Sequence, residues 1–326
     1  VKAELAKVNA EMNDTNEQTS SLKDKLGELG KGAAAAVAAF AGLAFGAKEA
    51  VQAYADYDDA VANAQKFTGM SREEIMQLNE EFKKMDTRTS INALNELAAS
   101  AGTLGKSTVE DVMGFVKAAD ILGVAMDELG EGAPQIISQL AGVFNLEGTM
   151  GTEKAMLAVG STINTLSQVC SAAAPNLVDF ASRLGAVAAQ TGMAFDEMLA
   201  FGALLDSQRV SVEKASTAIQ GVITKMYADP ATFAKKVGLN IQEFTDALKR
   251  SSTEGIMMFV DALSKMDNMK QAATLKELGS AGAGVVQTFQ TLAGKADDLR
   301  TRLEDAKGAF DDASSATEEF NVQNNT

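Results

Sequence analysis

The sequence contains no histidine and no tryptophan, and its 326 residues include one cysteine and three prolines. The lack of histidine removes the commonest general acid–base group and the commonest metal ligand. Cys170 alone can form neither an intrachain disulfide nor a cysteine-cluster metal site, and we interpret it as a buried, inert thiol. We therefore predict no catalytic, cofactor-binding or metal-binding residues, no cofactor, and no enzymatic activity.

Positive charge and aromatic side chains are also scarce. The chain has 29 basic and 44 acidic residues, which gives a net charge of −15. Such a surface repels phosphate backbones and anionic membranes, so we expect no specific nucleic-acid partner. Only 6% of the residues are aromatic, whereas 46% are hydrophobic and many of these are alanine. This composition favours long helices and bundles over a thick globular core.

The local signals along the chain are those of helices, and long alternating strand patterns are absent. Ser71-Arg-Glu-Glu74 and Ser107-Thr-Val-Glu110 match the capping box that begins a helix. Asp229-Pro230 places an N-cap residue directly before a proline of the first turn. We predict an all-α fold in which long coiled-coil-like terminal helices flank an array of helical hairpins.

The N-terminal residues carry the strongest pattern, a seam of uncharged residues at alternating spacings of four and three. Since 22% of the chain is charged, a random set of this size would hold about four charges, whereas the seam holds none. It indicates a heptad repeat, and a fully helical segment of this length would extend about 90 Å. Its members are Val1, Leu5, Val8, Met12, Thr15, Thr19, Leu22, Leu26, Leu29, Ala33, Ala36, Phe40, Leu43, Ala47, Ala50, Tyr54, Tyr57 and Val61.

A second seam of the same spacing occupies the C-terminal end. We expect Asp298 and Arg302 to form an ion pair on its outer face. The segment is suited to packing on the N-terminal helix or on copies of itself, and the pattern does not choose between them. The seam consists of Leu292, Ala296, Leu299, Leu303, Ala306, Phe310, Ala313, Thr317 and Phe320.

Between the two seams, glycine recurs at the ends of shorter amphipathic segments. Gly69, Gly105, Gly192 and Gly238 each stand where one apolar stripe ends and another begins. Glycine tolerates the left-handed conformation that closes a helix, so we expect stacked helical hairpins without a strict repeat period. We divide the chain into an N-terminal heptad helix with an alanine-rich segment (1–67), a helical-hairpin core (68–293) and a C-terminal heptad helix with its tail (294–326). Because the sequence starts at Val1, we expect it to be a fragment of a longer protein.

Three motifs resemble parts of known active sites, and for each we favour a structural interpretation. Residues 100–107 resemble a phosphate-binding loop, but serine stands where the first glycine is needed and a helix precedes the turn. Ser211-Val-Glu-Lys214 and Ser20-Ser-Leu-Lys23 match a Ser-x-x-Lys motif whose Lys-Thr-Gly companion is absent. Adjacent carboxylates, such as Asp58-Asp59 with nearby Asp56, are typical of solvated helix faces.

Residues 33–47 form an uncharged stretch that contains Gly42-Leu-Ala-Phe-Gly46. Small residues at this spacing allow close helix packing, often inside membranes. The stretch is shorter than the roughly 18–20 residues that span a bilayer, so we favour a tightly packed helix seam. Membrane contact by this segment remains the alternative.

From about Tyr54 to Gly294, the sequence resembles the core region of phage tail tape measure proteins. The resemblance covers about three quarters of the chain, and the order and spacing of its motifs make it more specific than any one motif. In order, these are Tyr57-Asp-Asp-Ala-Val-Ala-Asn-Ala, Thr68-Gly-Met-Ser-Arg-Glu-Glu-Ile, Leu94-Asn-Glu-Leu-Ala-Ala-Ser-Ala-Gly-Thr-Leu-Gly, Asn176-Leu-Val-Asp-Phe-Ala-Ser-Arg-Leu-Gly, Thr191-Gly-Met-Ala-Phe-Asp-Glu-Met-Leu-Ala and Leu275-Lys-Glu-Leu-Gly-Ser-Ala-Gly-Ala-Gly.

The resemblance implies a structural protein that scaffolds assembly of the tail tube, sets tail length and leaves the tail ahead of the DNA at ejection. It implies self-association through the heptad seams, contact with the tail tube protein and tail assembly chaperones, and contact with the host membrane at ejection. The expected location is the lumen of the virion tail, with assembly in the host cytoplasm. A membrane-active helical protein and a coiled-coil adaptor are the alternatives.

Overall fold

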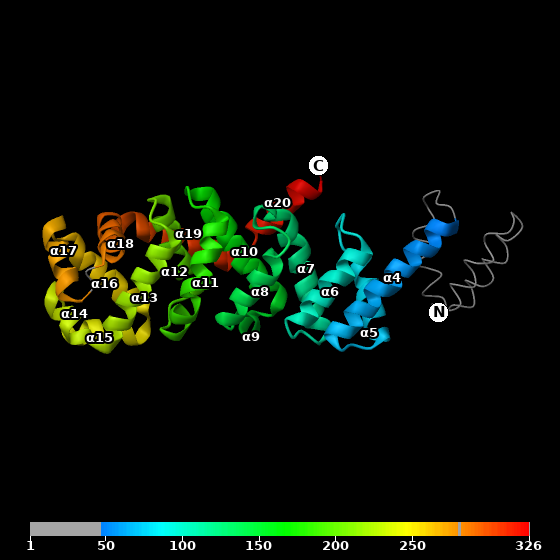
Figure 1. Ribbon diagram of the computed structural model, residues 1–326, viewed down its shortest axis with the longest axis horizontal. Coiled ribbons are helices and arrows are strands. Elements are labelled where there is room, and N and C mark those ends of the chain that lie inside the picture. The colour runs from blue at the N-terminus through cyan, green and yellow to red at the C-terminus, as the bar shows by residue number, and fades with distance from the viewer. Residues whose placement is uncertain (1–46, 280–281, 326) are drawn as a thin grey trace, which may run out of the picture. The chain divides into compact units, whose positions relative to one another are not determined.

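The computed structural model describes residues 47–279 and 282–325, and side chains from Gln52 onward. These residues form α-helices and one short 3-10 helix, and they contain no strand, so the predicted all-α class is confirmed (Figure 1). The seam positions before Ala47 and nearly all of the uncharged stretch 33–47 lie outside the described residues. The helices are α4 (Ala47–Thr68), α5 (Arg72–Phe82), α6 (Ile91–Thr103), α7 (Val109–Ala125), η1 (Asp127–Leu129), α8 (Ala133–Val143), α9 (Leu146–Met150), α10 (Thr152–Val169), α11 (Ala174–Gln190), α12 (Phe195–Ser207), α13 (Val212–Ala228), α14 (Pro230–Val237), α15 (Ile241–Arg250), α16 (Ser252–Ser264), α17 (Asn268–Glu277), α18 (Ala283–Gly294), α19 (Ala296–Asp312) and α20 (Ser315–Asn324).

The chain divides into two compact units, residues 1–112 and residues 113–326. In the first unit α4 packs along α6, and α5 covers both. The described end of the N-terminal seam lies inside this contact, because Tyr54, Tyr57 and Val61 are all buried. The seam residues that the sequence assigns to a coiled coil therefore pack within the chain itself over this stretch.

Two asparagines form a buried polar chain in the first unit. The side-chain amide of Asn79 donates to the hydroxyl of Tyr57 over 3.2 Å, and that of Asn95 donates to Oδ1 of Asn79 over 2.7 Å. Asn95 also donates to the backbone oxygen of Ile91 over 2.9 Å. Buried amides are tolerated only when they are hydrogen-bonded, so this chain fixes the relative register of α4, α5 and α6.

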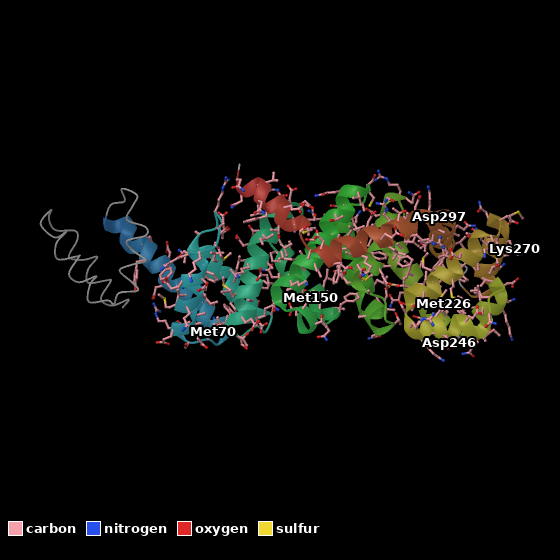
Figure 2. The ribbon with its side chains drawn as sticks, turned by 180° about the vertical axis from the view of Figure 1, so that it is seen from behind. Met70, Met150, Met226, Asp246, Lys270 and Asp297 are labelled. Carbon is pink, nitrogen blue, oxygen red and sulfur yellow. The ribbon has the colours of Figure 1, made fainter. Side chains whose placement is uncertain are left out.

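The second unit is built around α10, α11, α12 and α13. Helices α14 to α17 gather at one end of the unit, while α19 and α20 run back along it to α12 and α10 (Figure 1). Met226 of α13 is fully buried, whereas Asp246 and Lys270 carry charge on the outside of that end (Figure 2). The core there is aromatic: Phe259 lies between Phe233 at 5.5 Å and Phe289 at 5.7 Å between ring centroids.

The four glycine junctions are confirmed as helix ends. Gly69, Gly105, Gly192 and Gly238 have φ between +72° and +83°, the left-handed region that glycine enters without steric cost. At the last three junctions, the N–H of the residue after the glycine donates to the carbonyl five residues before it. The N–H of Leu239, for example, donates to the carbonyl of Ala234 over 2.8 Å. This is the Schellman arrangement, which satisfies backbone carbonyls at the helix end.

The predicted helix starts are confirmed at two of three places. Ser71 and Glu74 form both bonds of a capping box, and Asp229 accepts the N–H of Thr232 over 3.0 Å. The capping box predicted at Ser107 is wrong by one residue. Thr108 is the residue whose Oγ1 accepts the N–H of Asp111, because α7 begins at Val109.

The C-terminal seam is distributed over three helices. Lys295 separates α18 from α19, and Ala313, with φ of +55°, separates α19 from α20. The seam residues of α19 and α20 face α10 and α12 of the same unit, an arrangement that the seam alone does not indicate. The predicted ion pair between Asp298 and Arg302 is wrong. Asp298 pairs with Lys295 and Arg302 with Asp305, because both acids lie three residues from a base on one helix face.

Candidate functional site

The segment that resembles a phosphate-binding loop is a helix end. Residues 100–103 belong to α6, and the N–H groups of Leu104, Gly105 and Lys106 donate to helix carbonyls over 3.0–3.3 Å. A phosphate-binding loop needs such N–H groups free to surround the phosphate. The Lys106 side chain is also 8% exposed. These N–H groups are therefore already hydrogen-bonded within the helix end, as the structural interpretation of this motif predicts.

Ser211 and Lys214 occupy the start of α13. Both side chains are exposed, and the methylene groups of Lys214 lie beside Gly284 of α18. A Ser–Lys pair acts in acyl transfer when its lysine is desolvated and can accept the serine proton. Two solvated side chains at a helix start do not provide that environment. The second Ser-x-x-Lys motif, at Ser20, lies outside the described residues.

The described acidic residues do not form a metal centre: no group of three or more histidine, cysteine, aspartate or glutamate side chains converges there. Asp58 instead pairs with Arg72 at 2.6 Å between α4 and the start of α5.

Cys170 is half-buried rather than buried, because it ends α10, where its thiol donates to the carbonyl of Leu166 over 2.9 Å.

Polar groups that are distant in sequence meet where the α11–α12 corner contacts the α15–α16 corner. The N–H of Ser252 donates to the carbonyl of Thr191 over 2.9 Å, and the hydroxyl of Thr191 donates to that of Ser252 over 2.9 Å. The hydroxyl of Thr253 donates to Glu197 over 2.7 Å, and this carboxylate also accepts the N–H of Ala194. The two corners are thereby joined by bonds that span about 60 positions of the sequence.

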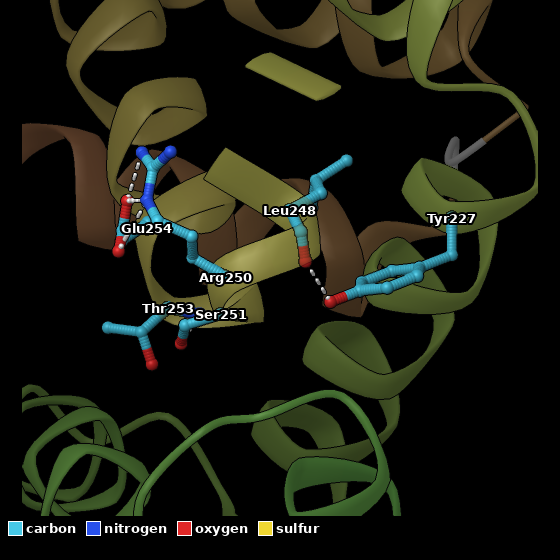
Figure 3. Close-up of polar contacts among 6 residues, drawn as sticks. All are labelled: Tyr227, Leu248, Arg250, Ser251, Thr253 and Glu254. Carbon is cyan, nitrogen blue, oxygen red and sulfur yellow. Dashed lines mark hydrogen bonds and ion pairs between the residues drawn. The ribbon is translucent and has the colours of Figure 1, made fainter. Parts of the chain in front are cut away.

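Tyr227 of α13 completes this contact. Its hydroxyl lies 2.6 Å from the carbonyl of Leu248, the bond drawn in Figure 3, and 3.0 Å from that of Thr191. Arg250 turns to the other side and pairs with Glu254 (Figure 3). Burial raises the pKa of the Tyr227 hydroxyl, so the group remains protonated and can donate. The hydrogen bonds of this cluster hold α13, the α11–α12 corner and the α15–α16 corner together.

Two aspartates lie near opposite ends of α12 and have different surroundings. Asp206, near its C-terminal end, accepts the N–H of Ala173 over 2.9 Å and the side-chain amide of Asn176 over 2.8 Å, and so caps the start of α11. Asp196, in the first turn, is buried beneath α19. Burial raises the pKa of the Asp196 carboxyl, with Glu197 acting in the same direction, while backbone N–H groups and Lys307 oppose the increase.

The sequence does not predict these polar contacts. Gly192 indicates a helix end, but nothing near it in the sequence shows that Ser252 and Tyr227 lie at the same place in the fold. The structure gives Gly192 a second role, because an added Cβ there would lie 3.0 Å from the carbonyl oxygen of Arg250.

Comparison with known proteins identifies the chain's family. The family model described as phage-related minor tail protein matches residues 72–280. The chain belongs to the phage-related minor tail protein family. The matched region begins with the first residue of α5 and includes the corner cluster, Asp196 and Asp206. No curated protein and no solved structure matches the chain significantly.

Membership of the minor tail protein family supports a structural role in a phage tail. Among the described helices, none combines the length and apolarity that crossing a bilayer requires.

Proposed function

We propose that this phage tail protein is a tape measure protein, which scaffolds tail tube assembly and sets tail length. The observation that carries the proposal is the match of residues 72–280 to the phage-related minor tail protein family. Two sequence features support it: the uncharged heptad seam of residues 1–61, and a net charge of −15 that disfavours retention of the DNA passing through the tail.

In this proposal the segments of the chain have separate tasks. The residues before α4 contribute measured length, α4 packs on α6 as part of the folded core that continues to residue 293, and residues 294–326 contribute to self-association. The tail tube protein and tail assembly chaperones are the partners, the tail lumen is the location, and contact with the host membrane accompanies ejection of the DNA.

The described helices restrict which residues can measure length. The described α-helices are 5 to 22 residues long, and tight turns join them. A residue in such an array adds far less than the 1.5 Å of axial length that a residue of a continuous helix adds. The folded hairpins therefore add little measured length, and the residues before them act as the ruler.

The test is to change chain length in the parent phage and to measure tails by electron microscopy. In-frame deletion of residues 1–28, four heptads, should shorten tails uniformly by about 40 Å, and duplication of these residues should lengthen them equally.

The matched control inserts 28 flexible residues into the exposed turn at Gly130, between η1 and α8. This addition should leave tail length unchanged, because it lies within the folded body. Normal tails of unchanged length in both deletion and duplication would refute the measuring role of residues 1–28.

A further inference from the structure

The apolar seam continues across the joint between α18 and α19. Lys295 is the only residue between the two helices, with φ of −127° and ψ of 28°. Seam residues keep the spacing of four and three from one helix to the next, so the sequence is compatible with one helix from 283 to 312. These residues are Val285, Phe289, Leu292, Ala296, Leu299, Leu303, Ala306 and Phe310.

The joint itself is open to solvent. Gly294 and Lys295 are exposed, and a Cβ built on Gly294 would meet nothing within 4 Å. Locally the bend is held by the N–H of Lys295, which donates to Leu292 over 3.2 Å, and by the exposed Lys295–Asp298 pair. Both contacts form within one turn of chain, so they oppose straightening of the joint only weakly.

Beyond the joint, α19 and α20 form a C-terminal arm (residues 296–324) that docks on distant parts of the unit. Phe310 lies 6.3 Å from Phe195 between ring centroids. Ser315 accepts the amide of Asn164 over 2.8 Å, and Ser161 accepts the N–H of Ala316 over 3.2 Å. Arg300 pairs with Asp261 at 2.5 Å. Each of these contacts joins a side chain or N–H group of the arm to a group elsewhere in the unit. The same contacts can therefore form with an arm from another copy of the chain.

An arm released from this position would expose side chains that are now buried, namely Leu299, Ala306, Ala316 and Phe320. The face of α10 and α12 beneath it would also be exposed, together with the buried Asp196. A second copy of the chain covers both surfaces at once, because its arm offers the same side chains and its α10–α12 face receives the first arm. Exchange of an identical element preserves the contacts and changes only the joint.

We propose that two copies of this chain associate by exchanging their C-terminal arms. Lys295 becomes helical, α18 and α19 straighten into one helix, and each arm docks on α10 and α12 of the other copy. This association does not depend on the length-setting role, since it uses only the arm and its docking face.

The experiment uses single cysteines on two separable chains, each with Cys170→Ser, which retains a donor for Leu166. One chain carries Asn164→Cys and the other, with a tag of different mass, carries Ser315→Cys. The chains are expressed together, oxidised, and separated on a non-reducing gel. Arm exchange predicts a disulfide-linked species of the summed mass. The matched control replaces Ser315→Cys with Ser264→Cys, an exposed position at the end of α16, and should give no such species.

A chain that carries both Asn164→Cys and Ser315→Cys shows where the arm lies when exchange fails. Complete intrachain disulfide in this variant, with no mixed species from the two single variants, would overturn the proposal. Lys295→Gly tests the joint separately: glycine is disfavoured inside the straight helix but is tolerated at the bent joint, so it should lower the yield of the mixed species about threefold per joint. An unchanged yield would show that the joint does not straighten.

Discussion

Gly102 of α6 lies against the backbone of Phe67 at the end of α4, so closely that an added Cβ would be 2.3 Å from the Phe67 carbonyl carbon. The carbonyl oxygen of Phe67 and the nitrogen of Thr68 would be 2.5 Å away. Backbone atoms cannot move aside as a flexible side chain can. The close approach of α4 and α6 therefore depends on the missing side chain at position 102.

Gly102→Ala is expected to destabilise the first unit by about 1–3 kcal/mol, because the two helices must separate to admit a methyl group. Tyrosine fluorescence in a Tyr227→Phe background can follow this unit in urea, since Tyr54 and Tyr57 are then the remaining tyrosines. Asn63→Ala in α4 is the control, because this position is exposed and belongs to the same unit, so the substitution should change stability by less than about 0.5 kcal/mol. Equal stability of the Gly102 variant and its parent would contradict the packing described.

Arg209→Gly is expected to stabilise the second unit by about 0.5–1 kcal/mol. Arg209 has φ of +61°, and the next residue, Val210, donates to Leu205 in the same Schellman arrangement as at the glycine junctions. Glycine relieves the steric cost that any L-residue has in this region. Gly238→Ala, at φ of +73°, should have the opposite effect in the same urea titration by circular dichroism. Destabilisation by Arg209→Gly would mean that the arginine side chain makes a contribution larger than the strain.

Tyr227→Phe should lower the free energy of unfolding by about 1 kcal/mol, because the carbonyl of Leu248 loses the hydroxyl that donates to it over 2.6 Å. Thr224→Val is a suitable control: its hydroxyl bonds only within α13, to Gln220, and its removal should change stability by less than about 0.5 kcal/mol. Urea unfolding of the two variants at neutral pH gives the comparison. A similar loss for both would show that Tyr227 does not join the two corners.

Asp196 makes the second unit less stable as pH rises. Its pKa in the folded chain is raised above the ordinary 3.8, mainly by burial, so the folded state binds more protons than the unfolded state between these values. Stability therefore falls as pH increases through this window and stays reduced above it. Asp196→Asn should be more stable than the parent at neutral pH, with the difference disappearing in acid.

Asp229 has the opposite effect on how the stability of the second unit depends on pH. Hydrogen bonds from Thr232 lower the pKa of its carboxyl, so its contribution is present at neutral pH and is lost as pH falls through the lowered value. Asp229→Asn should therefore flatten the acid side of the pH profile, which urea midpoints measured from pH 3 to 8 would reveal. If Asp196→Asn gave the same profile as Asp229→Asn, the assignment of Asp196 as a destabilising buried acid would be wrong.

The sequence by itself determined the fold class and many helix boundaries, because these depend on local chemistry. Glycine at Gly69, Gly105, Gly192 and Gly238 identifies helix ends through its conformational freedom, and Asp229-Pro230 identifies a start through one side chain and one fixed φ. Arg209 has the same left-handed φ as these glycines, but it is not a glycine. The sequence therefore contains no signal for the helix end at this position.

Only the tertiary structure decided what each apolar seam packs against. A seam predicts which residues are buried, but it does not predict whether the surface that covers them belongs to the same chain or to another. The described seam residues of α4 pack on α6, and those of α19 pack on α10 and α12. The meeting of Thr191, Ser252 and Tyr227 likewise required the fold, because hydrogen bonds between distant residues leave no periodic trace in a sequence.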